Sequence, residues 1–220
     1  MADDSVPSPR WQERTVNRSL RAARERAISR GDQFIAAAAE LLRTTGKPDF
    51  TVQEVVDRSG LSLRSFYQHF ATKDDLLLAI IEETVARYIA ALRPSIASES
   101  DPAEQLRILV TNLFGSPEAD DPAARGLVLF HWHLADTRTD EFAATLAPQL
   151  ELITEILEAG RACGQFRTDL SVPILAALVT NTLVSLLDMR VLGVRLAEEP
   201  VTADDVARWC LAAVRAPDGA

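Results

Sequence analysis

The sequence predicts an all-α protein of about nine helices, and three observations lead to this fold class. Apolar residues recur at three- and four-residue spacing along most of the 220 residues, which is the period of a helix face. Sustained alternation of apolar and polar residues is absent, as are Asn-Gly and Asp-Gly turns, so strand signals are missing. Several helix starts carry a Thr followed three residues later by an acid, which is a capping sequence.

The composition is ordinary for a soluble globular protein, with 47% hydrophobic and 25% charged residues. No secretory segment is recognisable near the N-terminus, and the most apolar stretch, 172–187, is short and contains Asn181. We therefore expect a cytoplasmic protein. Cys163 and Cys210 have no metal-type spacing and are expected to be reduced thiols that fill the core.

The charge is unevenly distributed along the chain. Residues 1–73 hold 12 Lys and Arg against 9 Asp and Glu, a balance of +3, whereas the remainder holds 11 against 23, a balance of −12. This asymmetry favours an N-terminal part that faces a polyanion. Because 21 of the 23 basic residues are arginine, a bias in coding composition also explains part of the arginine content.

The N-terminal segment 1–30 is predicted to be a disordered tail followed by an arginine-rich arm or weakly formed helix. Arginines stand at 10, 14, 18, 21, 24, 26 and 30, with few apolar residues between them. Two interpretations of this arm stay open: a contact with the minor groove or phosphates, and a disordered tail. A clear helix is expected over 31–45, ended by Gly46 and Pro48.

Two short helices separated by a glycine turn are predicted next. Thr51 to Glu54 forms a capping box that opens a helix to about Arg58, and Ser59-Gly60 ends it. Ser62 caps a second helix whose apolar side is expected to contain Leu63, Phe66, Tyr67 and Phe70. Another capping box, Thr72 to Asp75, begins a long helix that should end at about Arg93, before Pro94. This arrangement is a helix-turn-helix unit.

A helix-turn-helix reads DNA by placing its second helix in the major groove. Arg64, Ser65 and Gln68 are expected to point outward, and Arg and Gln are able to grip guanine and adenine bidentately. Tyr67, His69 and Lys73 have the reach and polarity to contact phosphate oxygens. An alternative is a connector whose polar face is merely solvated.

Residues 31–81 resemble the DNA-binding domain of the TetR (tetracycline repressor-like) family of bacterial transcription regulators. The resemblance rests on Phe50-Thr51-Val52, Gly60-Leu61-Ser62, Phe66-Tyr67-Gln68-His69-Phe70 and Lys73-Asp74-Asp75-Leu76-Leu77. It implies a repressor that leaves a palindromic operator when a small molecule binds, with a DNA-binding domain at 31–75 and a ligand-binding and dimerisation domain at 76–220. By position it implies phosphate contacts from Thr51, Tyr67, His69 and Lys73, and a place near base edges for Gln53, Leu63, Arg64, Ser65 and Gln68. Ser62 belongs to the same expected DNA-binding set, and Arg64 replaces a glycine that many members have.

The C-terminal region is predicted to be a bundle of helices over 103–114, 126–136, 140–162, 171–191 and 202–214, with a loop at 116–122. The helix at 140–162 is expected to be kinked or split at Pro148. Residues 172–191 are apolar on almost every side, which requires a central position or a second subunit. The resemblance implies a homodimer through about 172–192 and 203–215.

A small-molecule pocket is also implied by the resemblance, and the few charges on these helices favour an apolar or amphipathic ligand. The candidate contacts are Asn112, Phe114, Phe130, His133 and Asn181. His131 and His133 point about 200° apart on a helix, so no metal site is expected from them. No cofactor is expected and no catalytic motif is present. The competing function classes are an all-α ligand-binding or scaffold protein without a DNA role and, more distantly, an all-α enzyme.

Overall fold

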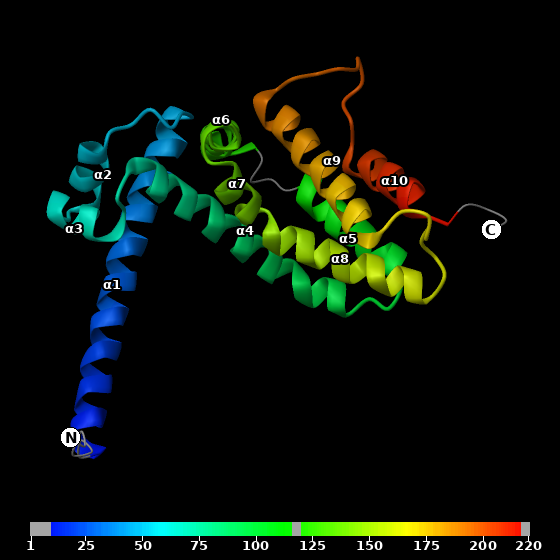
Figure 1. The fold of residues 1–220 in the computed structure, drawn as a ribbon. Coiled ribbons are helices and arrows are strands. Elements are labelled where there is room, and N and C mark those ends of the chain that lie inside the picture. Colours follow the sequence, from blue (N-terminus) through cyan, green and yellow to red (C-terminus); the bar gives the residue numbers. More distant parts are fainter. Residues whose placement is uncertain (1–9, 116–119, 217–220) are drawn as a thin grey trace.

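The computed structural model describes residues 10–115 and 120–216, which form ten helices and confirm the all-α fold class. Helices α1, α2 and α3 lie with the start of α4 at one end of the molecule, and α5, α8, α9 and α10 form a bundle at the other end (Figure 1). Helices α4, α6 and α7 lie between the two ends (Figure 1). The helices are α1 Arg10–Thr45, α2 Val52–Ser59, α3 Leu63–His69, α4 Lys73–Ala97, α5 Pro102–Gly115, α6 Pro122–Thr137, α7 Thr139–Thr145, α8 Ala147–Ala162, α9 Val172–Leu192 and α10 Ala203–Val214.

Helix α1 is much longer than the helix predicted over 31–45. It is one helix of 36 residues that begins at Arg10, so the arginine-rich segment is helical and the boundary expected at residue 30 falls inside it. Its N-terminal half projects away from the rest of the chain (Figure 1). Side chains from Arg24 to Arg30 are exposed, which agrees with the expectation that this segment lies outside the core. Of the tail expected at 1–10, residues 1–9 lie outside the described residues, and Arg10 begins α1.

The capping sequences fix the helix starts as predicted. Thr51, Thr72 and Thr202 each form a reciprocal capping box with the acid three residues later. Ser62 caps α3 by accepting a hydrogen bond from the backbone N–H of Ser65. Gly60 has a φ of 69°, the left-handed conformation that ends α2 and turns the chain into α3. Local sequence therefore determines the helix-turn-helix unit.

A first hydrophobic core holds the N-terminal end together. It joins the inward side chains of α1 to α4, and α6 adds Phe130 and Leu134 to it. The helix-turn-helix unit is therefore packed against a helix from the C-terminal half of the sequence. The fully buried members with the largest side chains are Phe34, Leu42, Phe66, Leu76, Leu77 and Leu134.

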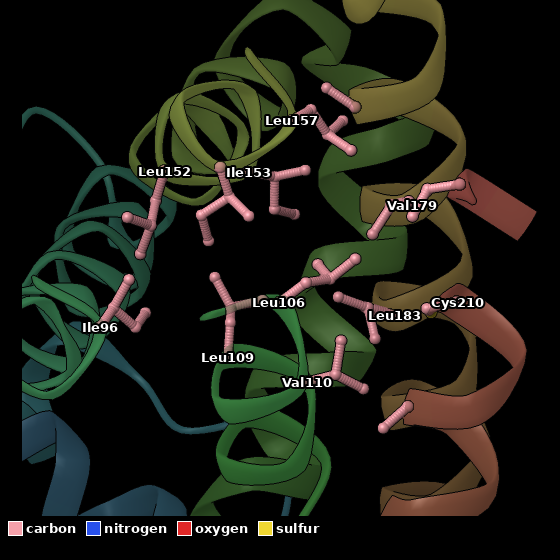
Figure 2. Close-up of a cluster of buried hydrophobic side chains, with 14 of the residues drawn as sticks. Ile96, Leu106, Leu109, Val110, Leu152, Ile153, Leu157, Val179, Leu183 and Cys210 are labelled. Carbon is pink, nitrogen blue, oxygen red and sulfur yellow. The ribbon is translucent and has the colours of Figure 1, made fainter. Parts of the chain in front are cut away.

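A second core fills the bundle, and α4 extends into it. Ile96 of α4 packs near Leu109 of α5 and Leu152 of α8, as the close-up in Figure 2 shows. Helix α4 contributes Ile89, Leu92 and Ile96 to this core. It continues to Ala97, whereas we predicted its end before Pro94. Pro94 lies inside α4, in its last turn, and removes one backbone N–H donor from the helix.

The bundle confirms the expected split of 140–162, two residues before Pro148, and corrects one expectation about the cysteines. The segment 140–162 is split into α7 and α8 at Leu146, and Pro148 then lies in the first turn of α8, where a proline is favoured. This split gives ten helices within the described ranges instead of nine. Cys210 fills the core as expected, but Cys163 is exposed at the C-terminal end of α8.

Helix α9 is the most apolar helix and is long enough to cross a membrane by length and composition alone. A core helix of a soluble protein passes the same test, although only 33% of this apolar window is buried within the chain. One side of α9 packs on α8, while Ile174 and Leu178 on another side are exposed. Trp209 of α10 is exposed as well. The prediction that α9 is covered on all sides is therefore not met by a single chain.

Gly126 sets the distance between α6 and α1. A Cβ at this position would lie 2.6 Å from Cδ2 of the buried Leu42, so Leu42 would have to move. We expect Gly126→Ala to lower the free energy of unfolding by about 1–2 kcal/mol relative to the matched change Gly115→Ala, because overpacking displaces well-packed side chains. Gly115 is the control since a Cβ there meets only an ordinary contact at 3.7 Å. Urea unfolding of both variants measures the difference, and equal stabilities would contradict the expectation.

Candidate DNA-binding face and ligand cavity

The exposed face of α3 is not the face that the apolar pattern predicts. Leu63 and Tyr67 are 43% and 56% exposed, whereas Ser65 is only 8% exposed. The inward side consists of Ser65, Phe66, His69 and Phe70, all buried or half-buried. Ser65 is therefore wrong as an outward base-reading residue, because it lies beside Phe66 on the side that packs against the core.

Four side chains remain on the outer face of α3: Leu63, Arg64, Tyr67 and Gln68. In the described part of the chain, no hydrogen bond or ion pair engages Arg64, Gln68 or the Tyr67 hydroxyl. The Tyr67 ring is held edge-on against Phe66, with ring centroids 5.4 Å apart. The face is thus rigidly positioned at its base and has unused donors and acceptors at its surface.

His69 has a different place from the one predicted. Its Nδ1 lies 2.8 Å from the carbonyl oxygen of Ser65, and its Nε2 lies 3.0 Å from the carbonyl oxygen of Ala27 in α1. In either tautomer of the neutral ring, one of these carbonyls receives an N–H. With both nitrogens directed at carbonyls of the chain, His69 bridges α3 to α1 instead of pointing to a phosphate.

The other predicted residues surround α3 at the ends of its neighbours. Thr51 and Ser62 are exposed, but their hydroxyls already accept the capping hydrogen bonds of α2 and α3. Gln53 is exposed and donates to Asp57 Oδ1 at 2.7 Å. Lys73 donates to the carbonyl of Pro48 at 2.9 Å and lies over the Phe50 ring, and an ammonium group has two further N–H donors.

A cavity of about 580 Å³ lies between the two ends of the molecule. Its walls come from α1, α4, α6 and α9, with Leu113, Leu146 and Gln149 between them. This size is within the range of small-molecule sites. The wall is mostly apolar and includes Ile35, Ala39, Ile80, Ile81, Val85, Ile89, Leu127, Val128, Val184, Leu187 and Val191.

A few buried polar groups interrupt this apolar wall. Asp188 of α9 is 7% exposed and accepts a hydrogen bond from Trp132 Nε1 at 3.0 Å. His131 Nδ1 lies 4.0 Å from the same carboxylate. Burial raises the pKa of Asp188 to about 6 and lowers the pKa of His131 to about 4, because each loses hydration of its charged form. His131 is therefore neutral at pH 7.

Residues 34–80 match the family described as bacterial regulatory proteins, tetR family. The chain contains a TetR-family DNA-binding domain. This family consists of non-enzymatic transcription regulators, so the chain is a DNA-binding transcriptional regulator. The match covers α2 and α3 entirely, together with the adjoining parts of α1 and α4.

Individual TetR-family proteins are similar over longer stretches. The activator FasR of Mycolicibacterium smegmatis is 28% identical over 116 residues, and the match spans about half (53%) of each chain. The repressor KstR2 of Rhodococcus jostii is 27% identical over 157 residues, which cover 70% of this chain and 76% of that protein. The structure of FadR from Bacillus subtilis in complex with stearoyl-CoA has the same fold, with a TM-score of 0.65, 18% identity, and coverage of 82% and 95%.

None of the five predicted ligand contacts lines the cavity. Phe114 and Phe130 belong to the two cores, and Asn112 is exposed and donates to the carbonyl of Ile108. His133 is exposed and its Nε2 lies 3.4 Å from Asp74 Oδ2 of α4. Asn181 is exposed and borders a groove between α9 and α10. The five residues stay predictions of ligand contacts, and none of them belongs to the wall of this cavity.

The cavity residues that were missed lie next to the predicted ones. Leu113 stands between Asn112 and Phe114, and His131 stands two residues before His133. One signal for Asp188 was present in the sequence, namely a single acid inside the apolar stretch 172–192. A lone acid in such a helix lies either at a boundary or in a polar pocket, and the structure places it in the cavity wall.

Because His69 bridges two helices and Tyr67 lies at the surface, we expect their replacement to have different effects. His69→Phe should lower the free energy of unfolding by about 1 kcal/mol, because it removes hydrogen bonds to backbone carbonyls. Tyr67→Phe should leave the free energy of unfolding unchanged and should weaken binding to every DNA duplex by the same factor. The DNA affinity of this variant should depend on salt concentration as that of the wild type does, because loss of a neutral hydroxyl changes no counterion release. Urea unfolding and fluorescence anisotropy at several salt concentrations test this, and a stable His69→Phe protein would refute the bridge.

The buried pair predicts opposite effects of pH on stability. Since the pKa of Asp188 is raised, its stabilising effect is present at low pH and is lost as the pH rises from about 4 to about 6. Since the pKa of His131 is lowered, its effect is present above pH 6.5 and is lost as the pH falls towards about 4. The two effects largely cancel in the wild-type protein.

Each effect should appear when the other group is removed. Between pH 4.5 and 6.5, we expect the free energy of unfolding of Asp188→Asn to rise by about 2 kcal/mol more than that of the wild type. Over the same range, that of His131→Gln should fall by a similar amount relative to the wild type. Urea unfolding across this pH range measures both slopes. The exposed carboxylate of Asp140 provides the control Asp140→Asn, which should follow the wild type. Parallel slopes for all four proteins would show that neither group is perturbed.

Proposed function

We propose that this regulator binds a palindromic operator as a homodimer, represses the adjacent genes, and is released when an apolar or amphipathic molecule occupies the cavity. The observation that carries this proposal is that α1 and α4 each contribute to two places. Both helices pack against the helix-turn-helix unit, and both supply walls of the cavity. A molecule in the cavity would therefore act directly on the supports of α3.

The DNA-binding part of the proposal rests on the outer face of α3. Arg64 and Gln68 are one helical turn apart and exposed, with no partner among the described residues. Arginine and glutamine are side chains that read base edges bidentately. Tyr67 lies on the same side with its hydroxyl exposed, and Lys73 retains two donors beside it, so we assign these two to phosphates.

The dimer rests on the exposed apolar surface of α9 and α10. Ile174, Leu178 and Trp209 are exposed, and Trp209 lines a groove between the two helices. Burial of such side chains against a second copy contributes roughly 25 cal/mol for each Å² of apolar surface removed from water. Two copies also supply the two recognition helices that a palindrome needs.

Repression is proposed over activation because the match to the repressor KstR2 extends over 70% of the chain, against 53% for the activator FasR. The ligand class follows from the apolar cavity wall. FadR of Bacillus subtilis, which has the same fold, is described with stearoyl-CoA, an amphipathic molecule. Because the proposed target is genomic DNA, we place the protein in the bacterial cytoplasm.

Operator binding tests the proposal through Arg64. With DNA from upstream of the protein's own gene, we expect two chains per duplex. Arg64→Ala should weaken the binding free energy for the preferred duplex by about 1–3 kcal/mol, and that for unrelated DNA much less, because a base contact is specific to one sequence. Gel shift and anisotropy measure both affinities. Arg195→Ala, in the exposed segment between α9 and α10, is the matched control. Equal losses on all DNA would reassign Arg64 to phosphates, and no specific binding at low salt would refute the regulator.

A further inference from the structure

Asp188 is an unusual group to find in the wall of an apolar cavity. It is buried, and the described residues give its carboxylate one hydrogen bond, from Trp132 Nε1 to Oδ2. His131 Nδ1, at 4.0 Å, is too distant to donate. A carboxylate has about four lone-pair sites, so most of the hydrogen-bonding capacity of Asp188 is unused.

No positive charge compensates Asp188. The cavity wall contains two arginines, Arg43 and Arg87, and neither forms an ion pair with Asp188 among the described contacts. Arg43 is paired with Glu40 instead. His131 is neutral because its burial lowers its pKa to about 4. A buried carboxylate without a cationic partner is costly, so a donor brought by a ligand would be strongly favoured there.

A second unused polar group faces the same cavity from α8. Gln149 is 5% exposed, and its Nε2 has no hydrogen-bond partner within the described residues. An amide nitrogen donates and does not accept, so it requires an acceptor atom from the occupant. The wall thus offers a buried acceptor at Asp188 and a buried donor at Gln149, surrounded by aliphatic side chains.

We infer that the cavity takes an apolar molecule that carries a hydroxyl or amine group, and that this group donates a hydrogen bond to Asp188. A molecule with a free carboxylate at this position is disfavoured, because two anions would meet in an apolar surrounding. This inference rests on the proposed role of the cavity as the ligand site and names the class of ligand. It assigns selectivity to Asp188, with Gln149 Nε2 donating to an acceptor atom of the same molecule.

The structure also contains the group that would oppose this selectivity. Arg87 is exposed, lines the cavity and has no partner among the described residues, so a carboxylate is able to meet it at the exposed edge. If ligands were held in that orientation, Asp188 would contact no charged group of the ligand. Ligand preference in Asp188 variants therefore distinguishes the two orientations.

The experiment compares decanol, decylamine and decanoate, which share one chain and differ in the terminal group. Binding to the full chain is measured by calorimetry and by the fluorescence of Trp132, whose indole contacts Asp188. We expect decanol and decylamine to bind at least about tenfold more tightly than decanoate. Asp188→Asn should reduce the preference for decylamine over decanoate about tenfold or more. Asp32→Asn, which removes an exposed carboxylate of the same cavity wall, should keep the wild-type preference.

Each result decides a separate question. Decanoate binding as tightly as the other two, or an unchanged preference in Asp188→Asn, overturns the role of Asp188 and leaves the cavity as a ligand site. An equal loss of preference in Asp32→Asn also overturns it, because the effect would then be one of overall charge. Leu127→Trp fills the cavity and should abolish binding of all three molecules. Binding that survives Leu127→Trp, or no binding to the wild type, refutes the ligand role of the cavity itself.

Discussion

The contact between α3 and α1 determines what the DNA-facing surface is able to present. A helix of seven residues is not stable alone, so its orientation comes from its packing. Phe34 of α1 meets Phe66 edge-on at 5.4 Å and Phe70 at 6.3 Å, and these aromatic pairs are buried or half-buried. His69 adds a polar bridge from α3 to the carbonyl of Ala27. Every exposed side chain of α3 therefore keeps its direction only while α1 keeps its position.

Helices α1 and α4 are in turn fixed by the part of the molecule that contains the cavity. Gly126 allows α6 to approach Leu42 of α1 closely. The other end of α6 is joined to the start of α4, where Arg138 Nη1 lies 2.9 Å from Asp75 Oδ1. Since α6 also supplies His131 and Leu127 to the cavity wall, displacement of α6 by an occupant changes both contacts at once. Packed helices shift between discrete arrangements, so a small displacement is able to reach α3.

The sequence predicted the features that depend on neighbouring residues and failed where distant contacts decide. The three capping boxes and the left-handed Gly60 involve residues within four positions, and all were predicted correctly. The inward side of α3 was predicted from apolarity, but Leu63 is exposed and Ser65 is buried because α1 and α2 approach from another angle. The opposite directions of His131 and His133 were predicted correctly, because they follow from the local geometry of a helix. Which of the two faces the cavity depends on distant contacts, and the sequence did not show it.

Helix α9 connects the proposed dimer with the proposed ligand site. Residues 184, 187, 188 and 191 line the cavity, while 174, 178, 181 and 185 are exposed on another side of the same helix. A second copy on the exposed side would bury an apolar surface that a single chain leaves in water. An occupant hydrogen-bonded to Asp188 would then act on the helix that sets the distance between two subunits. If both proposals hold, α9 has an apolar surface to cover on each of two sides, which would account for the near absence of a polar face.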